Sequence, residues 1–363
     1  MSIIVQTVKK SINSIRKLLP LFSFIIPFLI LYSLYPESFE ATWKGRTYYL
    51  FFLWLFLLEI ILNWEKLQAR KIDKMKSART VTFTIALLIP TVYVIVANFY
   101  GLNYMIENLA EQHNIPFASG IPLSTEYLVF AVLFALIVLL EYGISALRDF
   151  SISAVFLGII GVIYTIDNVY PFGAFTPFQI TVPTTATLAT NVLNLMGYQT
   201  RFLSPTYGMP VLIAWDSQGR HSLPFAIGWP CSGVESLLIY SVTILLFLQK
   251  SNIPWKHRII YFVIGGIVTY FINILRIITI FVISINGGDV WSFHNYYGQL
   301  YSISWIASYP FIIVVSRALW RKIRNGYKRS FWTIQDNSKK EITRCLSSKV
   351  EQQNVAKGKN CFA

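Results

Sequence analysis

Long apolar stretches recur along this chain and constrain its fold more than any other feature. A helix needs about 20 mostly apolar residues to cross the roughly 30 Å hydrocarbon core of a bilayer. Eight stretches approach or reach that length: Leu18–Tyr35, Tyr48–Trp64, Thr80–Tyr100, Tyr127–Leu147, Ile152–Tyr170, Ser232–Gln249, Ile259–Ile285 and Gln299–Trp320. Only 13% of the residues are charged, against roughly one quarter in soluble domains. The sequence therefore predicts an all-α polytopic membrane protein with about eight transmembrane helices.

The positive charges divide unevenly between the two sides that eight spans would create. If the N-terminus is cytoplasmic, the outer loops hold only Lys44, Arg46, Arg201 and Arg220 of the 31 Lys and Arg residues. Arg276 lies within a span, and the cytoplasmic segments hold all the others. Cytoplasmic loops carry such an excess, so we expect both termini in the cytoplasm. The net charge of +14 then indicates contact with anionic lipid headgroups rather than with nucleic acid.

The chain divides into three predicted regions. Residues 1–17 form a cytoplasmic basic N-terminus, and residues 18–320 form the polytopic membrane domain. Residues 321–363 are polar and basic, which predicts a disordered cytoplasmic tail.

The longest outer loop, residues 171–230, predicts a small extracytoplasmic insertion between helices five and six. Thr184–Met196 carries apolar residues at helical spacing, which predicts a short helix. Met209–Trp215 and Leu223–Ile227 flank a turn that ends at Gly219, which predicts a hairpin.

Arg276 is a charge inside the apolar stretch Ile259–Ile285. A guanidinium at hydrocarbon depth effectively cannot lose its proton and needs a partner or a water-filled cavity. Asn273 falls on the same face, one helical turn earlier. The functional interpretation is that Arg276 stabilises a developing negative charge. The structural alternative is a pair with Glu141, Asp167 or a backbone carbonyl.

Cys231 is predicted to face outward, whereas Cys345 and Cys361 lie in the cytoplasmic tail. Cys231 therefore has no disulfide partner within the chain, and an unpaired thiol on an oxidising face indicates a nucleophile. The alternative is a small buried residue packed at a helix end.

Cys231 opens the segment Cys-Ser-Gly-Val-Glu-Ser at the start of an apolar stretch. Ser232 and Gly233 let the backbone approach a substrate closely, and Ser236 lies near enough to donate a hydrogen bond. A helix N-terminus lowers the pKa of a thiol, so we expect a depressed pKa at Cys231.

His294 lies at the outer entry of the last apolar stretch. An imidazole can transfer a proton to a departing amine, although a lone interfacial histidine is often only part of an aromatic belt. The topology brings Cys231, Arg276 and His294 to one side on three consecutive helices. A thiol, a fixed cation and an imidazole are the parts of an acyl-transfer site with a cysteine nucleophile.

The ordered motifs Cys231-Ser232-Gly233 with Ser236, Asn273-x-x-Arg276, and His294 with Gly298 resemble those of the exosortase/archaeosortase family of membrane cysteine transpeptidases. The long outer loop and the His294 region are nearer to the archaeal branch. The chain differs from the family pattern in Pro230 before the cysteine and in Glu235 between the two serines.

The resemblance implies that Cys231 is the nucleophile, Arg276 its electrostatic partner and His294 the acid/base. It also implies that the substrates are surface proteins with a C-terminal sorting tail, made of a short motif, a transmembrane helix and a basic cluster. The acyl group would pass to an acceptor, such as a lipid amine, without a metal or an organic cofactor. Two alternatives are a membrane thiol protease without transfer, and a transporter or scaffold with a buried arginine.

Overall fold

A computed structural model of the chain describes residues 17–41, 44–64, 78–171, 174–298 and 300–324. It divides into two compact units, residues 1–308 and 309–363. The predictions for residues 1–16 and for the tail beyond residue 324, which includes Cys345 and Cys361, lie outside the described residues.

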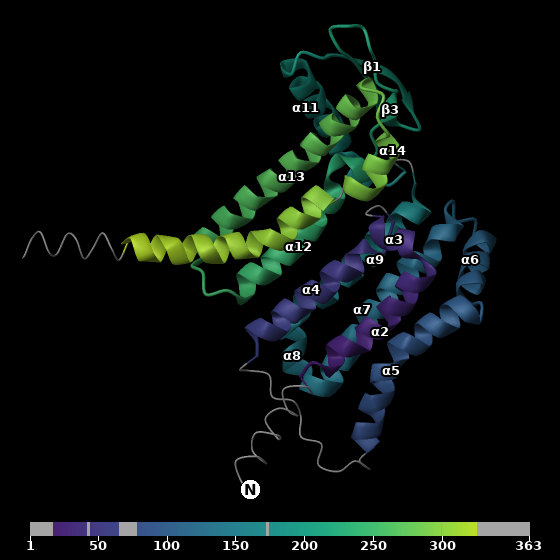
Figure 1. The fold of residues 1–363 in the computed structure, drawn as a ribbon, viewed down its shortest axis with the longest axis vertical. Helices are drawn as coiled ribbons and strands as arrows, with labels where there is room; N and C mark the ends of the chain where they lie inside the picture. Colours follow the sequence, from purple (N-terminus) through teal and green to yellow (C-terminus); the bar gives the residue numbers. More distant parts are fainter. Residues whose placement is uncertain (1–16, 42–43, 65–77, 172–173, 299, 325–363) are drawn as a thin grey trace, which may run out of the picture. The chain divides into compact units, whose positions relative to one another are not determined.

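Helices coincide with all eight apolar stretches (Figure 1). Seven are α2 (Leu19–Leu34), α4 (Thr47–Leu62), α5 (Ala78–Phe99), α7 (Ile121–Tyr142), α9 (Ser151–Val169), α12 (Val234–Lys250) and α13 (Trp255–Ile285). Residues 300–324 are also helical. The shorter helices are α3 (Pro36–Glu40), α6 (Leu102–Gln112), α8 (Ile144–Asp149), α10 (Thr176–Gln179), α11 (Val182–Leu195) and α14 (Val290–Ser292).

Five helical segments of the described chain are long and apolar enough to cross a membrane: 81–99, 118–142, 151–169, 255–285 and 290–324. Helices α2 and α4 are apolar but shorter, with 16 residues each. The protein is thus a multi-pass, mainly helical membrane protein, and the number eight stays a prediction. The span predicted over 127–147 begins earlier, at Ile121, and ends at Tyr142, because Gly143 breaks the helix before α8.

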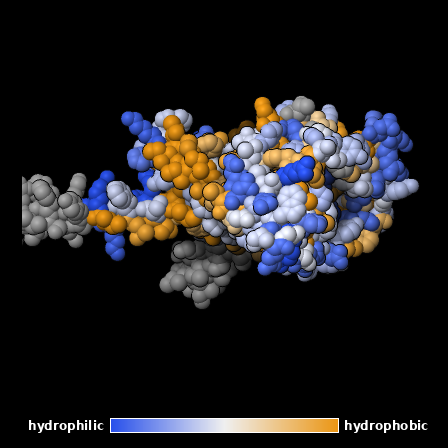
Figure 2. Space-filling model, turned by 90° about the horizontal axis from the view of Figure 1, so that it is seen from above, coloured by the Kyte–Doolittle hydropathy of each residue, from blue (hydrophilic) through white to orange (hydrophobic). Residues whose placement is uncertain are grey.

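The helices expose large apolar side chains, as lipid-facing surfaces do. Leu29 of α2, Val132 of α7 and Ile267 of α13 are each more than 60% exposed. A view onto the end of the first unit that carries the sheet shows hydrophilic and intermediate side chains over its centre and a hydrophobic patch to one side (Figure 2). Soluble monomers rarely expose large contiguous apolar surfaces, so the exposed apolar side chains of these helices support burial in a bilayer.

Helix α9 lies at the centre of the first unit, packed against α4, α7 and α12. Aromatic rings fill the core between α2, α4 and α7, where Phe28 stacks on Tyr49 and Phe24 meets Phe52 edge-on. Helix α12 in turn packs on α13. This chain of contacts connects the helical core to α12, which directly follows the predicted nucleophile, and to α13, which carries the predicted arginine.

A three-stranded antiparallel sheet lies between α11 and α12 in the chain. Its order is β1 (Gln199–Thr206), β2 (Met209–Trp215) and β3 (Phe225–Ala226). The predicted hairpin is confirmed by the pairing of β2 with β3, and the predicted short helix by α11. Strand β1 was not predicted. Most of its residues are exposed, so its sequence lacks the alternation of apolar and polar residues that indicates a half-buried strand.

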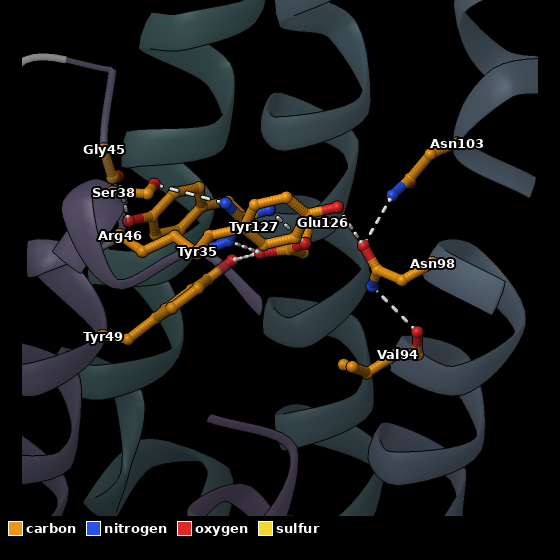
Figure 3. Close-up of polar contacts among 10 residues, drawn as sticks. All are labelled: Tyr35, Ser38, Gly45, Arg46, Tyr49, Val94, Asn98, Asn103, Glu126 and Tyr127. Carbon is orange, nitrogen blue, oxygen red and sulfur yellow. Dashed lines mark hydrogen bonds and ion pairs between the residues drawn. The ribbon is translucent and has the colours of Figure 1, made fainter. Parts of the chain in front are cut away.

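A buried ion pair joins Arg46, the residue just before α4, to α7 (Figure 3). The guanidinium of Arg46 donates to both carboxylate oxygens of Glu126, at 2.8 and 2.9 Å. The Tyr49 hydroxyl donates to the same carboxylate, and Arg46 lies over the ring of Tyr35. Arg46, one of the four cations in the predicted outer loops, is therefore a buried structural charge.

Candidate active site

Cys231 lies in a single 3₁₀ turn, η2 (Trp229–Ser232), just before α12. Trp229 is fully buried and packs on Phe178, which anchors the turn to α10. The Cys231 amide donates to the Gly228 carbonyl at 3.1 Å. Cys231 as a residue is half-buried, so this local structure leaves the cysteine partly accessible.

Gly233 separates the cysteine from α12 and has a left-handed backbone, with φ +89°. A Cβ at this position would meet the side chain of Asn273 at 3.0 Å. Asn273, on α13, donates from Nδ2 to the carbonyl of Cys231 at 2.9 Å. The glycine thus allows the close approach through which Asn273 fixes the backbone of the cysteine.

Ser232 is fully buried. Its hydroxyl donates to the Trp229 carbonyl at 2.8 Å and contacts the hydroxyl of Thr181 at 2.9 Å. Thr185 donates to the carbonyl of Ser232 at 3.0 Å. These contacts tie the turn to the start of α11, and neither threonine was singled out from the sequence.

Two other residues of the first turn of α12 are also buried. Ser236 is buried on the helix. Glu235 accepts a hydrogen bond from Tyr48 at 3.3 Å, which connects α12 to α4. Glu235 is thus an acidic residue in the first turn of α12.

Arg276 is almost fully buried on α13, and its guanidinium lies beside His294. Nη2 of Arg276 is 3.5 Å from Nδ1 of His294. Because a guanidinium has no acceptor, Nδ1 accepts in this contact and a neutral ring carries its proton on Nε2. Charge-assisted hydrogen bonds are usually about 2.7–2.9 Å long, so the contact is a weak one. Asp167, one of the partners considered for Arg276 from the sequence, pairs with Lys44 instead.

His294 reaches Arg276 because the chain turns back after α13. Asp289 caps α14 by accepting from the amides of Trp291 and Ser292. A π-helical turn, η3 (Phe293–Tyr297), follows and carries His294. Such turns are often found at functional sites, and this one brings the imidazole toward a guanidinium nine residues inside the end of α13.

Gly298 closes the π turn and lies against the arginine. Its amide donates to the Phe293 carbonyl at 2.7 Å. A Cβ on Gly298 would lie 2.7 Å from Nε of Arg276 and 3.2 Å from the carbonyl oxygen of His294. Any larger residue would therefore displace the guanidinium or the turn.

A cavity of about 530 Å³ brings the thiol and the imidazole to one space. Cys231 and His294 both line it, together with apolar residues of the sheet region and of α13. The apolar lining includes Met209, Leu223, Phe225, Ile227, Ile277, Ile280, Phe281, Val290 and Trp291. Ligand sites of this kind are mostly apolar with a few polar groups, and their usual size is about 300–1,000 Å³.

The cavity also holds an ion pair that sequence reasoning missed. Lys44 and Asp167 both line it, and Nζ of Lys44 lies 2.7 Å from the Asp167 carboxylate. Lys44 also donates to the side-chain oxygen of Asn168 at 2.7 Å. Lys44 is one of only four cations in the predicted outer loops. This scarcity is the sequence feature that could have pointed to a specific role for Lys44.

Burial raises the pKa of the Cys231 thiol. The positive charge of Arg276 lowers this pKa, and the carboxylates of Glu235 and Asp167 raise it. The expected depressed pKa is therefore wrong. The thiol precedes the Gly233 cap instead of lying in the first turn of α12, and its desolvation outweighs the arginine.

The site residues contain no cluster that would bind a metal. Within the described residues, no group of three or more His, Cys, Asp or Glu side chains lies close enough to hold an ion.

Comparison with family models matches residues 42–311 to the transmembrane exosortase family (Exosortase_EpsH). The matched range contains the cysteine turn, α13 and the π turn. No curated protein and no solved structure matches the chain. The family match covers well over half of the chain, and the exposed apolar helices agree with its membrane location. The chain therefore belongs to the transmembrane exosortases, membrane-embedded sorting enzymes of the cysteine transpeptidase/protease type that act on proteins with C-terminal sorting signals.

Proposed function

We propose that this exosortase cleaves the C-terminal sorting tail of surface proteins through a thioester on Cys231 and transfers the acyl group to an acceptor. The observation that carries the proposal is the shared cavity: Cys231 and His294 line it, and Arg276 contacts His294. The positive charge of Arg276 also acts on the thiol. The sequence placed these three residues on one side of the membrane independently of the structure, so their convergence supports a common role.

The resting site holds its nucleophile as a neutral thiol. Nδ1 of His294, the atom that could accept the thiol proton, is in contact with Arg276. Because this contact is long and weak, a substrate carbonyl oxygen can compete for the guanidinium. Substrate binding then leaves Nδ1 open to take the thiol proton.

The reaction proceeds in two halves. His294 accepts the proton of Cys231, and the sulfur attacks the scissile carbonyl carbon while Arg276 stabilises the oxyanion. His294 then gives the proton to the departing amine as the C–N bond breaks, which leaves a thioester. The acceptor attacks the thioester carbonyl and gives its proton to His294. As the C–S bond breaks, His294 returns this proton to the departing sulfur, which restores the Cys231 thiol and the neutral imidazole. Transfer to a lipid amine is transpeptidation, and transfer to water is hydrolysis.

The membrane arrangement follows from the charge distribution. We propose eight spans, an active site on the extracytoplasmic side, and both termini in the cytoplasm. An amphiphilic acceptor then reaches the thioester by diffusion in the membrane plane, which favours a lipid amine over water. The region 171–230 is the extracytoplasmic insertion in this scheme.

A transporter would need polar groups that line a path across the membrane. Glu59 instead caps the start of α9, where it accepts from the amides of Ile152 and Ser153, and pairs with Lys250 at 2.8 Å. Asp167 pairs with Lys44 near the other end of α9. Both carboxylates thus have structural partners at opposite ends of one helix, which favours the enzyme over the transporter.

The test is the mass of the new C-terminus on a protein that carries a sorting tail. With the wild-type enzyme we expect a truncated product extended by the acceptor, whereas a simple protease would leave a free carboxylate. Cys231→Ala and Cys231→Ser should both abolish processing. Alanine has no nucleophile, and the hydroxyl of serine is a much weaker nucleophile than a thiol in this site. Cys345→Ser and Cys361→Ser are the matched controls and should process normally. A Cys231→Ala variant that still processes the substrate would rule out the thioester.

Arg276→Lys should lose nearly as much activity as Arg276→Ala, about 10²–10³-fold. An ammonium cannot reproduce the planar fork of the guanidinium. If lysine restores most of the activity, Arg276 supplies only positive potential and its proposed contact with the oxyanion is wrong.

A further inference from the structure

The short strand β3 is an edge of the sheet that opens into the catalytic cavity. Within the described residues the sheet order is β1-β2-β3, which leaves β3 with a partner on one side. Leu223, Pro224, Phe225, Ala226, Ile227, Gly228, Pro230 and Cys231 all line the cavity. One continuous segment thus runs from the sheet edge to the nucleophile.

The hydrogen-bond pattern of the sheet orients the backbone of Ala226 away from β2. The amide of Ile227 donates to the Pro210 carbonyl at 2.9 Å, and Phe225 pairs with Leu212. Backbone groups alternate in direction along a strand, so those of residues 225 and 227 face β2. The N–H and C=O of Ala226 therefore face the open edge, and Ala226 is exposed.

Contacts with α13 fix the backbone of the segment 223–231 at its start, middle and end. At its start, the Leu223 amide donates to the Ser284 hydroxyl of α13 at 2.8 Å. In the middle, the Phe225 ring packs edge-on against Phe281, also on α13. At its end, Asn273 holds the Cys231 carbonyl. A prearranged backbone edge loses little conformational entropy when a peptide pairs with it.

We propose that the sorting signal binds as an extended peptide that adds to β3 through main-chain hydrogen bonds with Ala226. This inference rests on the proposed function and deepens it, because it states how the substrate is presented to Cys231. Strand addition gives affinity through backbone hydrogen bonds, and alternate side chains give specificity through pockets. The pockets here are the apolar walls formed by α13, Val290 and Trp291.

The spacing fixes which part of the peptide pairs with the edge. Ala226 precedes Cys231 by five residues, which spans at most roughly 16 Å of extended chain. The peptide residue that pairs with Ala226 therefore lies within about five residues of the scissile bond.

The first test compares Ala226→Pro with Ala226→Val on a reporter protein fused to a sorting tail that the wild-type enzyme cleaves. Proline removes the N–H that faces the open edge and leaves the β2 bonds of residues 225 and 227 in place. Valine keeps the N–H and adds similar bulk. We expect Ala226→Pro to raise KM roughly three- to tenfold, the effect of one lost hydrogen bond, with a much smaller change in Ala226→Val. Equal kcat/KM for the two variants and the wild type would overturn the inference.

The second test leaves the enzyme unchanged, so it holds even if Ala226→Pro does not fold. A synthetic peptide that spans the cleaved bond is N-methylated at one residue at a time, which removes one peptide N–H in each case. If the peptide binds by strand addition, an N-methyl group should slow cleavage only when it is placed at every second residue of the peptide. A uniform effect, or none, contradicts it. Cys231→Ala is run in parallel: if it still cleaves, the proposed function fails, whereas an inactive Cys231→Ala with a flat N-methyl profile defeats strand addition alone.

Discussion

At the scale of single residues, the charges around Cys231 decide when its sulfur can react. Burial holds the proton on the thiol, and the nearby carboxylates of Glu235 and Asp167 act in the same direction. Arg276 is the opposing charge. Because the thiolate is the reactive form, the rate of alkylation must rise with pH through a pKa above the ordinary value. The opposite effects of the arginine and of the carboxylates on the thiol pKa can therefore be measured separately by mutation.

We expect Arg276→Ala and Asp167→Asn to move the pH profile of Cys231 alkylation in opposite directions. Loss of the guanidinium raises the thiol pKa further, so the profile moves to higher pH. Loss of the Asp167 carboxylate lowers the thiol pKa, so the profile moves to lower pH. The measurement is the rate of iodoacetamide labelling against pH in a Cys345→Ser, Cys361→Ser background. Shifts of the same sign in both variants would show that a conformational change, not charge, controls the thiol.

Gly298 offers a second prediction at this scale. In Gly298→Ala the new Cβ would meet Nε of Arg276 at 2.7 Å, so the guanidinium must move. A displacement of about 1 Å at a catalytic group can cost on the order of 10²-fold in rate, and we expect that loss in kcat. Gly158→Ala on α9 is the control, because its Cβ would meet only Ala131, at 3.9 Å. Normal turnover of Gly298→Ala would mean that the position of Arg276 does not matter.

At the scale of elements, α13 organises the site. It carries Asn273, which holds the cysteine backbone, Arg276, which contacts His294, and Ser284, which anchors the segment before β3. Because all three lie on one 31-residue helix, a rotation of α13 would disturb the nucleophile, the cation and the strand together.

The hydrogen bond of Asn273 can be tested by Asn273→Asp, which keeps the shape but removes the donor to Cys231. We expect processing to fall about 10- to 100-fold, the cost of leaving a partly buried carbonyl without its donor. Asn286→Asp is the matched control. Asn286 also donates to a backbone carbonyl of α13, at 2.8 Å, but it is exposed at the helix end. Equal losses in both variants would assign the effect to α13 stability instead of the cysteine turn.

Sequence reasoning found the elements of the site because each has a strong local signal. An arginine within an apolar stretch, a cysteine before one and a histidine after another can be read directly, as can the helix α11 and the hairpin of β2 and β3. Lys44 and Asp167 were missed as a pair, because their meeting depends on how the loop before α4 packs on the end of α9. The thiol pKa was also missed, since desolvation depends on the packing around Cys231 rather than on its neighbours in sequence.

At the scale of the whole molecule, the sidedness of the membrane decides whether the cavity can receive surface proteins. A membrane-impermeant thiol reagent applied to intact cells should label Cys231 and leave Cys345 and Cys361 unlabelled until the membrane is broken. The labelling should be done at mildly alkaline pH and with a small reagent, because Cys231 is half-buried and burial raises the pKa of its thiol. Labelling of the tail cysteines in intact cells would overturn the proposed topology.

The protonated state of Cys231 also bears on how long the enzyme survives. Peroxides and other oxidants attack the thiolate, and the resulting sulfinic and sulfonic acids are essentially irreversible products. A thiol kept neutral by burial reacts slowly with them, and Cys231 is the only cysteine within the described residues, so no neighbouring thiol there could rescue a sulfenic acid by forming a disulfide. The same desolvation that raises the pKa of the Cys231 thiol therefore also protects the nucleophile from oxidation between turnovers.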